Sequence, residues 1–177
     1  MSNADQFEEH VARLEAAFPG VPSIGCIDMC YDTKVVEKGV GVVAYEGVTA
    51  VAGVLEQVSS MPIKYIQRFK NDLDKVRADS HDTVCIGFCM GNDACVMSTV
   101  GSVLGQKNVS LAGGTGDAGK VSVNGKIYTD ADAYVFVKKQ QRQGRRVQRE
   151  YLQTYGRGLQ AYRFQNRPRK LHHRRPE

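Results

Sequence analysis

The chain has 177 residues, of which 42% are hydrophobic and 24% charged, so it can bury one sizeable core without disulfide bonds or a structural metal. No apolar run is long enough to span a bilayer, and the first residues lack the basic and apolar segments of a secretory signal. Five cysteines cannot all pair, which argues against a disulfide framework and favours reduced thiols in the cytoplasm.

The net charge of +5 combines two segments of opposite sign. Residues 1–137 contain 11 Lys and Arg against 17 Asp and Glu, a balance of −6. Residues 138–177 contain 13 Lys and Arg against 2 Asp and Glu, a balance of +11. The sequence therefore predicts a mildly acidic domain over residues 1–139 and a distinct basic tail over residues 140–177.

The first predicted element is an amphipathic helix that ends at Pro19-Gly20, with Ser2 or Asn3 as its cap. Residues 24–27 predict a short buried strand, and the β-rich runs 40–45 and 49–55 predict a hairpin that turns at Glu46-Gly47. A second helix is expected to begin near Pro62. The apolar residues at helical spacing are Phe7, Val11, Leu14 and Phe18 in the first helix and Ile63, Ile66, Leu73 and Val76 in the second.

The second half of the domain alternates strand and helix before it ends in a hairpin. Residues 83–88 form a nearly continuous apolar run, which is typical of a central strand covered on both faces. A helix with Met97, Val100 and Leu104 on its inner face follows, and then a strand at 109–112, a hairpin closed by Asn124-Gly125, and a strand at 131–137. This order predicts an α/β fold: a mixed sheet with flanking helices and a C-terminal β-hairpin.

A glycine-dense turn between two of these strands is the predicted ligand site. Glycine allows a ligand to approach the backbone closely, and ligands usually bind where the strands of an α/β sheet end. Carboxylates at Asp28 and Asp117 could hold an ammonium group, while glycine amides and Thr115 could receive a carboxylate, which suits an amino acid. The alternative is ordinary turn chemistry. The predicted ligand-binding residues are Cys26, Asp28, Asn92, Gly113, Gly114, Thr115, Gly116 and Asp117.

Two motifs of the chain resemble those of the FIST sensory domain. The first is the run from Pro19 to Cys26, which resembles a Val-Pro-x-x-Gly-Cys strand of that family. The second is the glycine turn of residues 113–117 with the hairpin and strand that follow it. The resemblance covers residues 5–139, and the family pattern implies that both ends of the domain are missing.

The FIST resemblance implies a function in bacterial or archaeal signal transduction. It implies an input domain that binds a small ligand, proposed for the family to be an amino acid or similar metabolite, without catalysis, cofactor or membrane insertion. Such a domain passes a conformational change to a signalling partner such as a chemoreceptor, kinase or cyclase.

An enzyme that uses Cys89 is the first alternative function. This residue lies where a strand gives way to a helix, so a helix N-terminus could favour its thiolate. Nucleophilic catalysis also needs a base, and the body of the chain offers only His10 and His81, neither of which the sequence brings to Cys89. Capping of the helix by Asn92 or Asp93 is the simpler role for this segment.

Two further motifs lack the context that their chemistry needs. The run from Gly114 to Lys120 resembles a phosphate-binding loop, but Val121 and a strand follow where Ser or Thr and a helix are required. The pairs Cys26/Cys30 and Cys85/Cys89 are spaced more widely than typical zinc knuckles. The sequence therefore predicts neither a nucleotide nor a metal.

The basic tail suggests a nucleic-acid-binding arm, since its tyrosines could stack on bases between the arginines. Codon degeneracy offers another explanation. One set of codons that can encode residues 148–156 gives Lys-Glu-Asn-Ile-Phe-Lys-Pro-Met-Gly when it is read one nucleotide later, and residues 160–177 can give a second such peptide in the same way. Both peptides resemble the continuation of FIST domains. We therefore interpret residues from about 140 onward as a frame-shifted reading, which predicts a disordered segment and makes nucleic-acid binding the second alternative.

Sequencing of the DNA that encodes residues 130–177 tests this interpretation. We expect the shifted frame to continue into an open region that encodes FIST-like sequence. An intact gene in close relatives that keeps the same basic tail would contradict the frameshift and favour nucleic-acid binding.

Overall fold

The computed structural model describes residues 1–27, 30–31, 34–35, 38–60, 62–90, 93–140, 149–154 and 159–164. None of the helices in these ranges is long and apolar enough to cross a membrane. The helices are α1 (Phe7–Ala17), α2 (Ile66–Lys75) and α3 (Asp93–Gly105), with 3-10 turns η1 (Ala4–Gln6) and η2 (Pro62–Tyr65). The strands are β1 (Ile24–Ile27), β2 (Cys30–Tyr31), β3 (Lys34–Val35), β4 (Gly41–Tyr45), β5 (Val48–Glu56), β6 (Thr83–Cys89), β7 (Ser110–Thr115), β8 (Asp117–Val123), β9 (Lys126–Thr129), β10 (Ala131–Lys139), β11 (Arg149–Thr154) and β12 (Leu159–Phe164).

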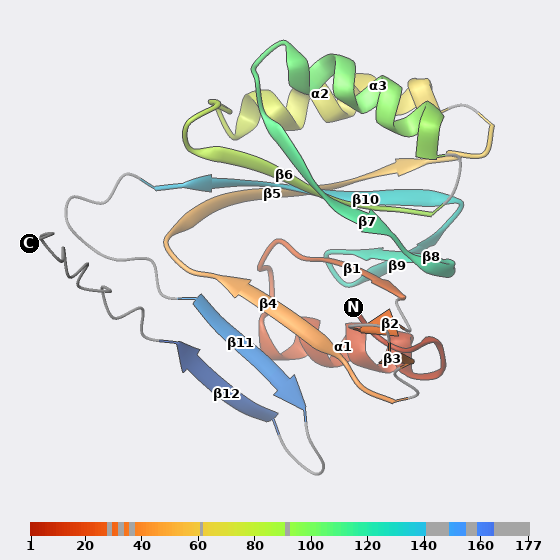
Figure 1. Ribbon diagram of the computed structural model, residues 1–177, viewed down its shortest axis with the longest axis vertical. Helices are drawn as coiled ribbons and strands as arrows, with labels where there is room; N and C mark the ends of the chain where they lie inside the picture. Colours follow the sequence, from red (N-terminus) through yellow and green to blue (C-terminus); the bar gives the residue numbers. More distant parts are fainter. Residues whose placement is uncertain are drawn as a thin grey trace, which may run out of the picture.

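Two sheets and the three helices stack in four layers (Figure 1). Helices α2 and α3 cover one face of the sheet β5-β10-β6-β7, and the sheet β1-β8-β9 covers the other face. Helix α1 lies on the far side of this second sheet. In the first sheet β10 runs antiparallel to β5 and β6, whereas β6 and β7 are parallel. The predicted α/β fold with a mixed sheet and flanking helices is therefore confirmed.

Strand β10 is buried on both faces because its alternate side chains enter different layers. Tyr134 and Phe136 point toward the helices, and the ring of Phe69 in α2 lies 4.7 and 5.0 Å from their centroids. The Tyr134 hydroxyl donates a hydrogen bond of 2.8 Å to Asp72 Oδ2, and burial raises the pKa of Tyr134, which keeps the hydroxyl protonated. Ala133, on the opposite face, packs in the core between the two sheets.

The predicted hairpin at Glu46-Gly47 is wrong. Strand β5 pairs with β10, whereas β4 pairs with β11 in a third sheet, so the two strands do not pair with each other. Gly47 has a φ of +70°, which lets the chain bend from one sheet into the other. The later hairpin is confirmed: β8 and β9 are antiparallel, and Asn124 and Gly125 both have positive φ, as a tight hairpin turn requires.

The chain start is held by tertiary contacts instead of the predicted helix cap. The Ser2 hydroxyl lies 2.7 Å from His10 Nδ1, and Asn3 Oδ1 accepts a hydrogen bond of 3.3 Å from the Gly39 N–H. Neither side chain caps η1 or α1. Both residues are buried, so the first residues of the chain are part of the packed structure.

Three residues that were predicted on inner helix faces are exposed. Phe18 is 45% exposed because α1 ends at Ala17, and Ile63 is 62% exposed because it lies in η2, where a spacing of 3.6 residues does not apply. Met97 is 45% exposed because it lies outside the buried face of α3. That face consists of Val96, Val100, Val103 and Leu104.

Two segments of the basic tail form strands. Strands β11 and β12 are antiparallel partners, and β11 also pairs with β4. The prediction of disorder is therefore wrong for residues 149–154 and 159–164. For the other residues from 141 to 177 that prediction lies outside the described part of the chain.

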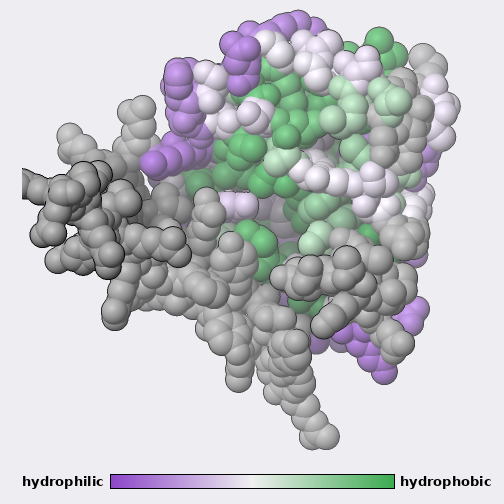
Figure 2. Space-filling view, in the orientation of Figure 1, coloured by the Kyte–Doolittle hydropathy of each residue, from purple (hydrophilic) through white to green (hydrophobic). Residues whose placement is uncertain are grey.

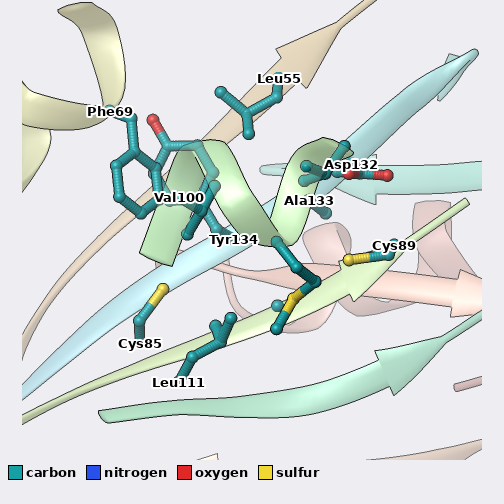
Figure 3. A pocket seen from close by; sticks show the side chains of 12 residues that line it. Leu55, Phe69, Cys85, Cys89, Val100, Leu111, Asp132, Ala133 and Tyr134 are labelled. Carbon is teal, nitrogen blue, oxygen red and sulfur yellow. The ribbon is translucent and has the colours of Figure 1, made fainter. Parts of the chain in front are cut away.

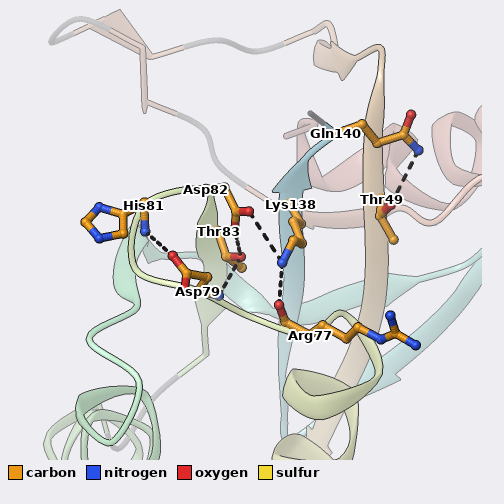
Figure 4. Close-up of polar contacts among 8 residues, drawn as sticks. All are labelled: Thr49, Arg77, Asp79, His81, Asp82, Thr83, Lys138 and Gln140. Carbon is orange, nitrogen blue, oxygen red and sulfur yellow. Dashed lines mark hydrogen bonds and ion pairs between the residues drawn. The ribbon is translucent and has the colours of Figure 1, made fainter. Parts of the chain in front are cut away.

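A polar cluster fastens the end of β10 (Figure 4). Lys138 Nζ donates a hydrogen bond to the Arg77 carbonyl and lies 3.4 Å from Asp82 Oδ2. The Lys139 N–H donates to the Asp82 carbonyl over 2.8 Å, and the Thr83 hydroxyl donates to the Asp82 carboxylate over the same distance. Because the Lys138 and Asp82 side chains are only 24% and 18% exposed, this ion pair is partly shielded from solvent.

Gly53 provides space for Tyr134, which predicts a steric effect of a small substitution. A Cβ at Gly53 would lie 2.3 Å from the Tyr134 ring, and Phe69 together with the hydrogen bond to Asp72 prevents the ring from moving away. We expect Gly53→Ala to lower the free energy of unfolding by about 1–3 kcal/mol, the usual cost of overpacking a core. Urea denaturation measures this change.

Gly87 offers the matched control, because it lies opposite Tyr134 on the other side of β10. A Cβ there would meet its nearest atoms at 3.5 and 3.7 Å, which is ordinary contact. We expect Gly87→Ala to leave the urea midpoint within the error of the wild-type value or to raise it slightly. Equal destabilisation by both substitutions would contradict the steric explanation.

Candidate functional site

The predicted ligand site lies where the chain passes from the first sheet to the second. Gly113, Gly114 and Thr115 belong to β7 and Asp117 begins β8, so the predicted turn is a crossing between strands in which only Gly116 belongs to neither. The Gly116 N–H donates a hydrogen bond of 2.8 Å to the Cys89 carbonyl. Since β6 and β7 are parallel, this bond joins their carboxyl ends at one edge of the sheet.

Packing explains two of the three glycines in this segment. Gly113 has a φ of +145°, and a Cβ there would lie 1.8 Å from the Gly87 carbonyl oxygen. A Cβ at Gly116 would lie 2.7 Å from Met90 Sδ and 3.1 Å from the Cys26 Cβ. These two positions require glycine because neighbouring atoms leave no room for a side chain.

Gly114 is different because the fold does not require glycine there. Its φ is outside the left-handed region, and a Cβ would have open space around it. Gly114 and Thr115 are both exposed at the carboxyl end of β7. This pair is therefore the accessible part of the predicted site, with bare backbone beside a hydroxyl group.

The structure brings the β1 and β7 segments of the predicted site together. Ile27 lies opposite Asp117 in the ladder between β1 and β8, and this places the end of β1 beside the crossing. Cys26 is 2% exposed in the core between the two sheets. Asp28, Asn92 and the side chain of Asp117 lie outside the described residues.

Sequence reasoning missed Asp132, a carboxylate that is 3% exposed at the start of β10. Its Oδ1 accepts a hydrogen bond of 2.7 Å from the Met90 N–H, which directly follows β6. Burial of a carboxylate lowers the stability of the fold unless the carboxylate is hydrogen-bonded. This hydrogen bond therefore helps to fix the backbone at the end of β6. The signal in the sequence was an acidic residue within an otherwise apolar strand, Ala131-Asp132-Ala133.

Asp132 also lines a small cavity beneath α3 (Figure 3). Cys89, Tyr134 and Leu111 line the same cavity, and all three are labelled in the close view. Its volume of about 20 Å³ has room for about one water molecule. An amino acid does not fit there in this arrangement, so the exposed end of β7 is the better candidate for first contact with a ligand.

The described residues bring no imidazole to Cys89. His10 lies on α1 in another layer, and His81 precedes β6, whose far end carries Cys89. Burial, and secondarily the neighbouring Cys89, raises the pKa of Cys85 to about 12, so that thiol stays protonated at neutral pH. Among the described residues, no group of three or more His, Cys, Asp or Glu could hold a metal ion.

The hydrogen bond from Met90 to Asp132 predicts how the end of β6 is held. We expect Asp132→Ala to lower the free energy of unfolding by about 1–3 kcal/mol, because the partly buried Met90 amide loses its acceptor. Asp132→Asn keeps an acceptor oxygen and should cost less. Urea denaturation of both variants measures the difference, and an unchanged midpoint in Asp132→Ala would contradict the assigned role.

No curated protein and no solved structure matches the chain. The family model described as FIST N domain matches residues 1–154 and therefore extends beyond the 5–139 range of the sequence resemblance. Because this match includes most of the 177 residues, the chain belongs to the FIST N domain family, a family of sensory domains in signal transduction.

Proposed function

We propose that this FIST domain binds a small, amino-acid-like ligand at the carboxyl ends of β6 and β7 and has no catalytic activity. The observation that carries the proposal is Gly114, an exposed glycine whose backbone is bare although neither its φ nor its neighbours demand glycine. A position of this kind lets a ligand approach the peptide group closely.

The chemistry of the proposed site suits a zwitterion. The Thr115 hydroxyl can donate a hydrogen bond to a ligand carboxylate, and the exposed Gly114 peptide lies beside it. The sequence provides two carboxylates for an ammonium: Asp117, the first residue of β8, and Asp28, which follows Ile27 in the sequence.

The proposed signal arises because the ligand-contacting strand continues into a second sheet. Gly116 alone separates β7 from β8, so a shift at the end of β7 also moves the start of β8. A ligand that binds one arrangement of these strands more tightly changes the population of that arrangement. The readout would be a separate signalling protein such as a chemoreceptor, kinase or cyclase, in the cytoplasm of a bacterium.

The absence of catalysis is part of the proposal, and the environment of Cys89 supports it. This cysteine is half-buried beneath α3, and the described part of the chain brings neither His10 nor His81 to it. A nucleophilic cysteine needs a base within hydrogen-bond reach. Slow thiol labelling of the native protein at neutral pH is the corresponding expectation.

Thermal denaturation with a panel of the twenty amino acids tests ligand binding. We expect one chemical subset to raise the melting temperature in proportion to the logarithm of its concentration, as binding to the native state requires. At 100 times the Kd the stabilisation amounts to about 2.7 kcal/mol. A panel in which no compound changes the melting temperature would contradict the proposed ligand class.

Gly114→Ala tests where the ligand binds. We expect this substitution to weaken binding of the stabilising compound at least about tenfold, or roughly 1.4 kcal/mol, because the new methyl group occupies space beside the peptide. Isothermal titration calorimetry measures the change. Gly41→Ala in β4 is the matched control, since Gly41 also lies in a strand with open space around it. Equal affinities in the two variants would place the ligand elsewhere.

A further inference from the structure

The cavity beneath α3 is apolar inside, although polar residues contribute to its wall. Its hydrocarbon wall includes Leu55, Phe69, Val96, Val100 and Leu111. Tyr134 also lines the cavity, but its hydroxyl donates a hydrogen bond to Asp72. Asp132 is the charged residue among the described residues of the wall, and its Oδ1 accepts a hydrogen bond from the Met90 N–H. The cavity therefore favours a hydrocarbon group over an ammonium or a carboxylate, which would lose its hydration there.

Gly87 leaves part of this space open. It lies opposite Tyr134 in the pairing of β6 with β10, on the face that the helices cover. A Cβ at Gly87 would lie 3.5 Å from Leu111 Cδ1, so a methyl group fits beside Leu111 without a clash. The cavity volume of about 20 Å³ has room for about one water molecule, and a methyl group is of similar size. The fold therefore leaves room for one methyl-sized group in an apolar environment.

The cavity extends toward the proposed ligand site. Cys89 lines the cavity and lies opposite Thr115 in the parallel pairing of β6 with β7. Neighbouring strands are about 4.8 Å apart, so Thr115 is one strand spacing from this part of the wall. Met97 also lines the cavity and is 45% exposed, and Figure 2 shows green and pale residues over the region where α3 lies in Figure 1. The apolar wall of the cavity therefore reaches the surface at the end of β6, beside the proposed site.

We propose that the amino-acid ligand has a long, unbranched apolar side chain whose terminal methyl group occupies the cavity beneath α3. The inference rests on the proposed function and adds the class of side chain. Cys89 and Gly87 are successive residues on one face of β6 and are therefore about 6.6 Å apart. A side chain of several atoms is needed to pass Cys89 and reach the space at Gly87. Among the twenty amino acids, methionine has this length, an unbranched chain and a methyl end.

The shape and polarity of the cavity exclude other side chains of similar size. Leucine and isoleucine are branched, and a closely packed wall with room for one methyl-sized group does not accept a second branch. Lysine is unbranched, but its ammonium would enter an apolar space. Alanine and glycine are too short to reach the cavity. The cavity therefore selects by the form of the side chain, while the groups at the end of β7 bind the part that all amino acids share.

Isothermal titration calorimetry of the full wild-type chain with methionine, norleucine, leucine and lysine tests this selection. We expect methionine and its sulfur-free analogue norleucine to bind at least about tenfold more tightly than leucine or lysine, as expected for a fitted apolar pocket. Equal affinities for methionine and leucine, or tighter binding of lysine, would overturn the inference and leave the proposed function intact. Failure of every amino acid to bind would overturn both.

Gly87→Ala tests whether the cavity is the source of the selection. Its methyl group would take the space beside Leu111, so the ratio of the leucine Kd to the methionine Kd should fall about tenfold. This ratio cancels any effect on the groups that bind both ligands. Gly101→Ala is the matched control, because Gly101 is exposed on α3 and a Cβ there would have open space around it. We expect it to keep the wild-type ratio. The wild-type ratio in a Gly87→Ala variant that is folded by circular dichroism would overturn the inference.

Discussion

Strand β10 joins the layers of this domain, because it is hydrogen-bonded on both sides and buried on both faces. Its partners are β5 and β6, and the nine-residue pairing with β5 extends along the whole strand. The two faces differ in size: Tyr134 and Phe136 fill the space beneath α2, while Ala131 and Ala133 let the second sheet approach closely. The helices, both sheets and the candidate site are therefore arranged around one strand.

The strengths of sequence reasoning here follow from local patterns. The apolar run of β6, the Asn124-Gly125 turn and the alternation of strands and helices each have a signal within a few residues, and all three were predicted correctly. The partners of β4 and β5 had no such signal, because pairing between distant segments depends on the whole fold. The same limitation applied to β11, which pairs with a strand more than 100 residues earlier.

The candidate site was predictable in position but not in the role of each residue. A glycine-dense segment indicates that another group lies close to the backbone. The sequence could not show whether that group belongs to a ligand or to the protein itself. The fold separates the two cases: a Cβ at Gly113 or Gly116 would clash with the Gly87 carbonyl or with Met90, whereas a Cβ at Gly114 would have open space around it. Asp132 escaped notice because its significance depends on Met90, which is 42 residues away in the chain.

The order in which the chain visits the two sheets has a consequence for folding. After β7 completes the edge of the first sheet, the chain builds β8 and β9 of the second sheet and only then returns as β10, between β5 and β6. Neither sheet can therefore be made from one continuous fragment of the polypeptide. A proteolytic cut within residues 116–130 would fall in the second sheet and would also separate β10 from the other strands of the first sheet. Because the two sheets share the chain in this way, they should unfold in one cooperative transition, without a stable half-domain.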